Sequence, residues 1–139
     1  MTEDEAVARA RALLGVRFRP QGRDPDYGLD CIGVVVVAFE LSGVGRDYRL
    51  RSGDANAAAA GLASSGFVPA GVAVPGDVLL MHAGHRQLHL AILTPAGFVH
   101  ADAGLRRSWK FRVRRPGRWR ARGGTRIRVA RRCEWRRLF

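Results

Sequence analysis

The feature that most constrains this chain is an apolar run, Ile32 to Leu41, that begins directly after Asp30 and Cys31. Its four consecutive valines would favour a buried strand by local propensity. Its length, and the presence of Gly43 and Gly45 as a plausible helix C-cap, favour a helix instead. Asp30 is then a suitable N-cap residue, and Cys31 stands on the first helical turn.

A cysteine at the start of a helix can serve as a nucleophile. Unpaired backbone N–H groups and the helix dipole favour negative charge at that end, and thiols so placed can titrate between about 3.5 and 7.5. The alternative is a small buried core residue, which is how most free cysteines behave. Taken alone, Cys31 fits the core interpretation better, so a catalytic interpretation requires a base elsewhere in the chain.

Two histidines downstream can supply that base. His89 alternates with apolar neighbours in Leu88–Leu93, a strand-like pattern, and His100 ends a second strand-like segment, Gly97–His100. The turn at Pro95–Gly97 would join the two segments into a hairpin and place the histidines near each other. A base and a partner that orients it are what a nucleophilic cysteine requires. The three residues together predict a thiol hydrolase site.

Four stretches of the chain resemble the NlpC/P60 family of cell-wall cysteine peptidases, especially its phage-tail-associated branch. They are Gly28–Gly33 for the nucleophile motif, Pro75–Leu80 for the Pro-Gly-Asp strand, His89–Ile92 for the strand that bears the base, and Phe98–Ala101 for the segment with the third polar residue. Their order and spacing agree with the family over roughly Ala6 to Ala103, and the ordered set is more specific than any one motif. Ile32 stands where the family usually has a serine, a departure that the phage-type members tolerate.

The resemblance implies a fold and a reaction. The fold is α+β and papain-like, with helices near the N-terminus, the nucleophile at a helix N-terminus, and an antiparallel sheet from about Asp77 onward. Cys31 would be the nucleophile, His89 the general base and later acid, and His100 the residue that orients the imidazole. The reaction would be hydrolysis of amide bonds in peptidoglycan stem peptides, at the γ-D-glutamyl-to-diamino-acid bond, without a cofactor.

Three residues near the nucleophile are candidates for substrate binding or for the oxyanion site, where the N–H of Cys31 would also act. The family has a tyrosine about a dozen residues before the cysteine, and Phe18 stands there without the hydroxyl. Tyr27 could supply a hydroxyl from another direction or pack on the surface, and Asp30 adjoins the nucleophile. The loss of the hydroxyl at Phe18 favours a second interpretation, a structural tail-tip or baseplate protein that keeps the peptidase fold with little activity.

Two further helices and one histidine pair complete the pattern. Glu5–Leu14 reads as an amphipathic helix capped by Thr2, and Asp54–Ala60 resembles a capped helix. His82 and His85 form a His-x-x-His pair without a nearby carboxylate or second cysteine, which is a poor zinc pattern. We therefore expect no metal, and place these two histidines in a loop.

Charge divides the chain into two predicted segments. Residues 1–105, the predicted NlpC/P60-like catalytic core, hold 9 arginines and 11 acidic residues, a net charge of −2. Residues 106–139 hold 14 arginines, Lys110 and one acidic residue, a net charge of +14. Alternation in Thr125–Val129 and the three tryptophans of this arginine-rich segment predict strands that continue the same domain.

The arginine-rich segment has several possible roles. It could be a solvated strand face, bind anionic wall polymers or stem-peptide carboxylates, or dock on acidic neighbours in an assembly. Nucleic acid is the least favoured partner, because no recognised binding motif accompanies the charge.

The remaining expectations concern the compartment and the partners. The longest apolar run is too short to cross a bilayer, so no membrane partner is expected and acyl transfer on lipids is disfavoured. Met1–Glu5 is acidic and does not resemble a signal peptide. The sequence therefore predicts synthesis in the cytoplasm and action at the cell wall within a virion, a phage tail or a gene transfer particle, with tail or baseplate hub proteins as partners.

Overall fold

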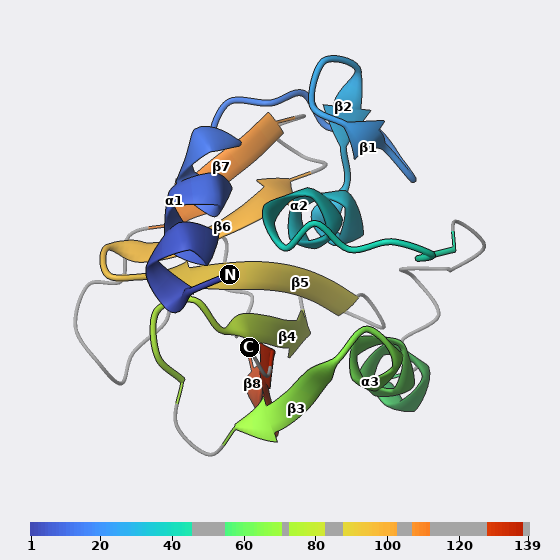
Figure 1. Ribbon diagram of the computed structural model, residues 1–139, viewed down its shortest axis with the longest axis vertical. Helices are drawn as coiled ribbons and strands as arrows, with labels where there is room; N and C mark the ends of the chain where they lie inside the picture. The colour runs from blue at the N-terminus through green and yellow to red at the C-terminus, as the bar shows by residue number, and fades with distance from the viewer. Residues whose placement is uncertain (46–54, 71–72, 83–87, 103–106, 112–127, 138–139) are drawn as a thin grey trace.

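A curved six-stranded antiparallel sheet forms the centre of the fold, and the helices pack beside it (Figure 1). The computed structural model describes residues 1–45, 55–70, 73–82, 88–102, 107–111 and 128–137. The strand order in the sheet is β3-β8-β4-β5-β6-β7. Those strands are β3 (Phe67–Ala70), β4 (Val78–His82), β5 (Leu88–Thr94), β6 (Gly97–Asp102), β7 (Arg107–Phe111) and β8 (Arg128–Arg137).

The helices and a small hairpin complete the architecture. Helices α1 and α2 lie across β5 and β6 in Figure 1, and α3 lies beside β3. The two-stranded hairpin of β1 and β2 lies directly before α2. The bounds are Glu3–Ala12 for α1, Arg23–Asp24 for β1, Gly28–Leu29 for β2, Cys31–Ala38 for α2 and Ala55–Ser64 for α3.

Helix α1 begins where the sequence predicts a cap. Thr2 accepts from the backbone N–H of Glu5 at 3.1 Å, and the Glu5 carboxylate accepts from the N–H of Thr2 at 2.6 Å, which makes a capping box. These hydrogen bonds lower the pKa of the Glu5 carboxyl, with the backbone bond at Thr2 as the main cause. The cap at Thr2 is confirmed, and the helix begins and ends two residues earlier than expected.

Helix α2 is shorter than its apolar run. It ends at Ala38 because Glu40 takes a left-handed conformation, with φ of 53°, and Leu41 donates back to the carbonyl of Val36 at 2.9 Å. This is a Schellman C-cap built on a non-glycine residue. The expected end near Gly43 was wrong, since Glu40 terminates the helix before that glycine is reached.

Arg9 on α1 reinforces the end of α2. Its guanidinium donates to the carbonyls of Ala38 at 2.9 Å and Val37 at 3.2 Å, and it pairs with the Glu40 carboxylate at 3.0 Å. The last carbonyls of a helix have no partner within the helix, so these bonds satisfy them and fix α1 against α2.

Strand β8 lies in the interior of the sheet, between β3 and β4. Trp135 is opposite Val78 on one side and Pro69 on the other in the strand register. The sheet also begins earlier in the chain than Asp77, because β3 joins it through β8. Of the predicted strand Thr125–Val129, only Arg128 and Val129 lie within the described residues, where they begin β8.

The main core lies between the helices and one face of the sheet. It includes Cys31, Val34 and Val35 of α2 together with Leu90 and Ile92 of β5. A smaller cluster, Leu79, Met81, Ala91 and Phe98, occupies the opposite face. None of the helices in the described ranges has the length and hydropathy needed to cross a membrane.

Candidate active site

Cys31 is the first residue of α2, and its side chain is 1% exposed. The preceding Asp30 has extended backbone angles, and its Oδ1 accepts from the backbone N–H of Gly33 at 2.7 Å. This is N-cap geometry, so the expected helix start and cap are confirmed. The cap places the thiol where the first-turn N–H groups have no partner within the helix.

Asp30 also anchors the loop that precedes the helix. Its Oδ2 accepts from the backbone N–H of Gln21 at 2.8 Å, and its Oδ1 lies 3.2 Å from Nη1 of Arg23. The side chains of Asp30 and Arg23 are 1% and 11% exposed, so this is a buried ion pair. Asp30 was a candidate for contact with substrate. Its buried carboxylate instead binds the helix cap and the loop, which makes it a positioning residue.

Glycines bring the loop into backbone contact with α2. A Cβ at Gly33 would lie 2.1 Å from the carbonyl oxygen of Gly22, and a Cβ at Gly22 would lie 2.1 Å from that of Gly28. Gly28 also has a φ of 127°, which L side chains rarely adopt. These three positions therefore require glycine, and they hold the loop, β2 and the start of α2 as one packed unit.

The start of α2 meets the sheet where two strands separate. Pairing of β5 with β6 runs from Thr94 opposite Gly97 to Ile92 opposite Val99 and then stops, although both strands continue. The next N–H on that edge of β5 belongs to Leu90, which packs with Cys31 in the main core, and this N–H lowers the pKa of the thiol.

The two histidines lie on either side of this split. His89 directly precedes Leu90, and its ring centroid is 5.9 Å from that of His100 on β6, at an interplanar angle of 85°. The Phe98 ring packs against His100 at 5.5 Å. The hairpin therefore brings the two imidazoles into edge contact. Cys31 packs with Leu90, the residue that follows His89, in the main core.

Burial controls the charge state of the thiol. Desolvation raises the pKa of Cys31 to about 12, and the negative charge of Asp30 acts in the same direction. The N–H groups of Leu90, Ile32 and Cys31 itself lower the pKa, but by less than burial raises it. The lowered pKa expected from the helix end alone was wrong for the free protein, since the sequence does not show how completely the sulfur is removed from water.

The structure also shows where most of the other predicted residues lie. Phe18 is half-buried, pairs with Leu29 in an isolated bridge, and packs against the core cluster that contains Cys31. Tyr27 is 64% exposed, so it lies on the surface of the loop. The loop expected for His82 was wrong, since His82 is the last residue of strand β4, and His85 is outside the described residues. Within the described ranges, no group of three potential ligand side chains could hold a metal ion.

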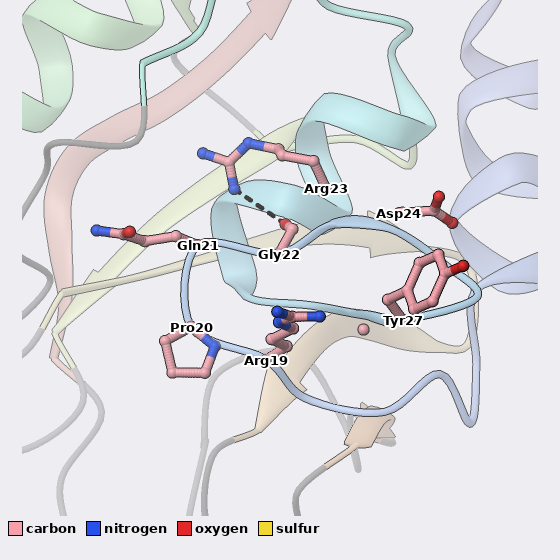
Figure 2. Close-up of a pocket in the computed structure, with 8 residues that line it drawn as sticks. Arg19, Pro20, Gln21, Gly22, Arg23, Asp24 and Tyr27 are labelled. Carbon is pink, nitrogen blue, oxygen red and sulfur yellow. Dashed lines mark hydrogen bonds between the residues drawn. The ribbon is translucent and has the colours of Figure 1, made fainter.

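The loop before α2 encloses a pocket of about 320 Å³ that the sequence did not predict. Figure 2 shows Arg19, Pro20, Gln21 and Tyr27 around it, with Arg23 turned away toward the carbonyl of Gly22. The loop differs from an ordinary surface turn because Gln21 has a left-handed φ of 57°. The signal in the sequence was indirect, because Pro20, Gly22 and Gly28 predict a loop with tight turns but do not predict a pocket.

Comparisons with known proteins agree with the geometry at the level of fold. No protein-family model matches the chain, and no curated protein matches it. Among solved structures, the chain is similar to the NlpC/p60 domain of the peptidoglycan hydrolase SagA, with a TM-score of 0.57 and 21% identity over 81% of this chain and 90% of that one. A P60 domain from the M. avium subspecies paratuberculosis antigen MAP1204 is similar at a TM-score of 0.49 and 22% identity, over 83% of this chain and 88% of that one. The expected α+β class is confirmed, and the chain has the fold of NlpC/P60 domains.

Proposed function

We propose that this protein is a cysteine endopeptidase that hydrolyses amide bonds in peptidoglycan stem peptides. The observation that carries the proposal is the position of Cys31, the first residue of α2, which packs in the main core with Leu90, the residue next to His89. The contact between His89 and His100 supports it, because a base needs a partner that orients it. The hydrolase fold of the SagA domain supports the substrate class.

These positions support the following reaction. His89 removes the thiol proton as the sulfur of Cys31 attacks the scissile carbonyl, because a thiol with a pKa of about 12 is neutral at rest. The N–H of Cys31 stabilises the oxyanion, and His89 then donates its proton to the leaving amine. Water deprotonated by His89 releases the acyl group from sulfur, while His100 holds the imidazole in position.

Fragment release from purified sacculi tests this assignment. Cys31→Ala should abolish release, and His89→Ala should reduce it by about 10²–10⁴-fold, the usual contribution of a general base. His100→Ala should cause a smaller loss, since it acts through His89. Each variant is checked by its urea unfolding curve, so that a loss of activity is separated from a loss of fold. Undiminished release by Cys31→Ala would remove the assignment.

The proposal also covers which peptide bond is cleaved and the phage-like particle in which the protein acts. The resemblance of the Gly28–Gly33 motif to the family supports the γ-D-glutamyl-to-diamino-acid bond, and Ile32 after the nucleophile supports the phage-type branch. Mass spectrometry of the released fragments identifies the bond. Peptides of this chain in purified tail-like particles, and their absence from matched fractions of a deletion strain, test the particle.

A second candidate is a structural tail-tip or baseplate protein with this fold and little activity. The 1% exposure of Cys31 and the absence of a hydroxyl at Phe18 favour it. Phe18→Tyr separates the two functions, because it restores the family hydroxyl beside the core cluster. An enzyme should gain activity from this change or keep it, whereas a structural protein should release no fragments in either form.

A further inference from the structure

We infer that the pocket in the loop before α2 is a subsite that binds a carboxylate of the peptide substrate through Arg19. The inference rests on the proposed function and specifies which part of the substrate the enzyme recognises. The pocket is lined by residues 19–24, Tyr27 and Gly28.

Arg19 supplies the charge. Its side chain is exposed, and the guanidinium makes no hydrogen bond or ion pair within the described part of the chain. Its Cβ stacks over Gly28, where a Cβ would lie 2.7 Å away, so the start of the side chain is fixed by the backbone of β2. A planar guanidinium with five N–H donors recognises a carboxylate through two parallel hydrogen bonds.

The other cation of the pocket is already used. Arg23 donates to Asp30, to the carbonyl of Gly22 at 3.0 Å and to that of Gly45 at 3.1 Å, so its charge is compensated within the protein. The Asp24 carboxylate accepts from the N–H of Asp26 at 2.9 Å, and Figure 2 shows it directed away from Arg19. Arg19 is therefore the group available to an anion in this pocket.

Tyr27 and Gln21 give the pocket its shape. The 64% exposed ring of Tyr27 forms a wall beside Arg19, and an exposed aromatic ring with a polar tip is suited to a ligand that is partly apolar. The left-handed backbone of Gln21 is held by its hydrogen bond to Asp30. The pocket is thus braced by the same carboxylate that caps the helix of Cys31.

The distance to the nucleophile fits a short peptide. Gly28 lines the pocket and precedes Cys31 by three residues, so their Cα atoms are at most ~11 Å apart. An extended peptide advances about 3.3–3.6 Å per residue, so a carboxylate one to three residues from the scissile bond can reach the pocket. The γ-glutamyl linkage of the proposed substrate leaves the α-carboxylate of that residue free, whereas an ordinary peptide bond uses the α-carboxyl group.

A binding experiment on the Cys31→Ala chain tests the subsite without turnover. The probes are a short γ-glutamyl peptide with a free α-carboxylate and the same peptide with that carboxylate converted to an amide, measured by calorimetry. The carboxylate peptide should bind about tenfold more tightly than the amide, and Arg19→Gln should remove that difference. Arg19→Lys should restore part of it, because lysine retains the charge without the paired donors.

Arg11→Gln serves as the matched control, since Arg11 is exposed on α1 and does not line the pocket. This control should keep the full preference for the carboxylate. Equal preference in Arg19→Gln and in Arg11→Gln would overturn the subsite. In the active chain, Arg19→Gln should raise KM by a similar factor with little change in kcat.

The two proposals can fail separately. Cleavage of sacculi that does not respond to Arg19→Gln would remove the subsite and leave the peptidase. Carboxylate-selective binding that depends on Arg19, in a chain that releases no fragments, would remove the peptidase and leave a binding site.

Discussion

Burial keeps the Cys31 thiol, the proposed nucleophile, protonated. Three backbone N–H groups lower the pKa of this thiol, yet removal from water dominates and raises the pKa to about 12. A thiol of this kind does not rest as a thiolate, so its reactivity depends on a base acting during the attack. This differs from cysteine enzymes that hold a stable thiolate–imidazolium pair.

The pH dependence of alkylation measures this state. For a thiol whose pKa is raised, the reactive thiolate increases about tenfold per pH unit until the pH reaches that pKa. Labelling of Cys31 by iodoacetamide, followed by peptide mass spectrometry, should therefore keep rising from pH 7 to beyond pH 9. A plateau below pH 8 would instead indicate a resting ion pair with an imidazole.

The ion pair of Arg23 with Asp30 predicts a coupled loss of stability. Arg23→Met leaves a buried carboxylate without its cation and should lower the free energy of unfolding by about 3 kcal/mol, the lower end for breaking a buried pair because Arg23 retains some exposure. Asp30→Asn keeps a good N-cap residue and removes the charge. Urea unfolding of both single variants and the double variant should show the double variant to be more stable than Arg23→Met alone. Additive losses would contradict the coupling.

At the scale of the elements, the helix ends show which structural features depend only on residues nearby in the sequence. Thr2 and Asp30 could be identified from sequence because an N-cap depends on residues within one turn. The end of α2 could not, since it depends on a left-handed Glu40 held next to Arg9 from another helix. The four valines were resolved correctly as a helix because length and caps outweighed local propensity.

Glu40 offers a direct test of the C-cap. Glycine adopts the left-handed conformation about 1 kcal/mol more easily than other residues, whereas the exposed ion pair with Arg9 contributes about 0.5 kcal/mol or less. Glu40→Gly should therefore raise the free energy of unfolding by about 0.5 kcal/mol. Glu40→Ala, which loses the ion pair and keeps the unfavourable backbone, should lower it slightly, and equal values for the two variants would contradict this account.

The site was predictable in part for the same reason. The positions of Cys31, His89 and His100 in their elements follow local patterns, and the hairpin brings the two rings together. The split between β5 and β6, the salt bridge of Arg23 and the pocket at Arg19 depend on contacts between separate elements. The catalytic roles of the three residues stay predictions.

For the whole molecule, the placement of β8 matters most. It pairs with β3 on one side and β4 on the other, so it joins α3 and β3 to the rest of the sheet. Charge, alternation and tryptophans in the sequence predict strands in this region, but they do not predict the order of those strands in the sheet. The sheet therefore includes residues of the arginine-rich segment, which the sequence predicts to be strands of the same domain.

Removal of β8 should abolish cooperative folding. A chain that ends at residue 127 leaves β3 and β4 without their shared partner and exposes two interior edges. Its urea transition should lose cooperativity, and a synthetic peptide of residues 128–137 should restore the transition when added. An unchanged midpoint in the shortened chain would show that the sheet closes without this strand.

The contacts among Gly22, Gly28 and Gly33 also limit how this protein can diversify. Backbone touches backbone at these positions, so even one added methyl group has to displace the loop from the helix. Arg19 and Tyr27, by contrast, extend from that rigid unit into solvent. Mutational libraries selected for folding should tolerate changes at these two side chains and almost none at the glycines. New ligand preferences can therefore evolve at the rim while the support beneath stays constant.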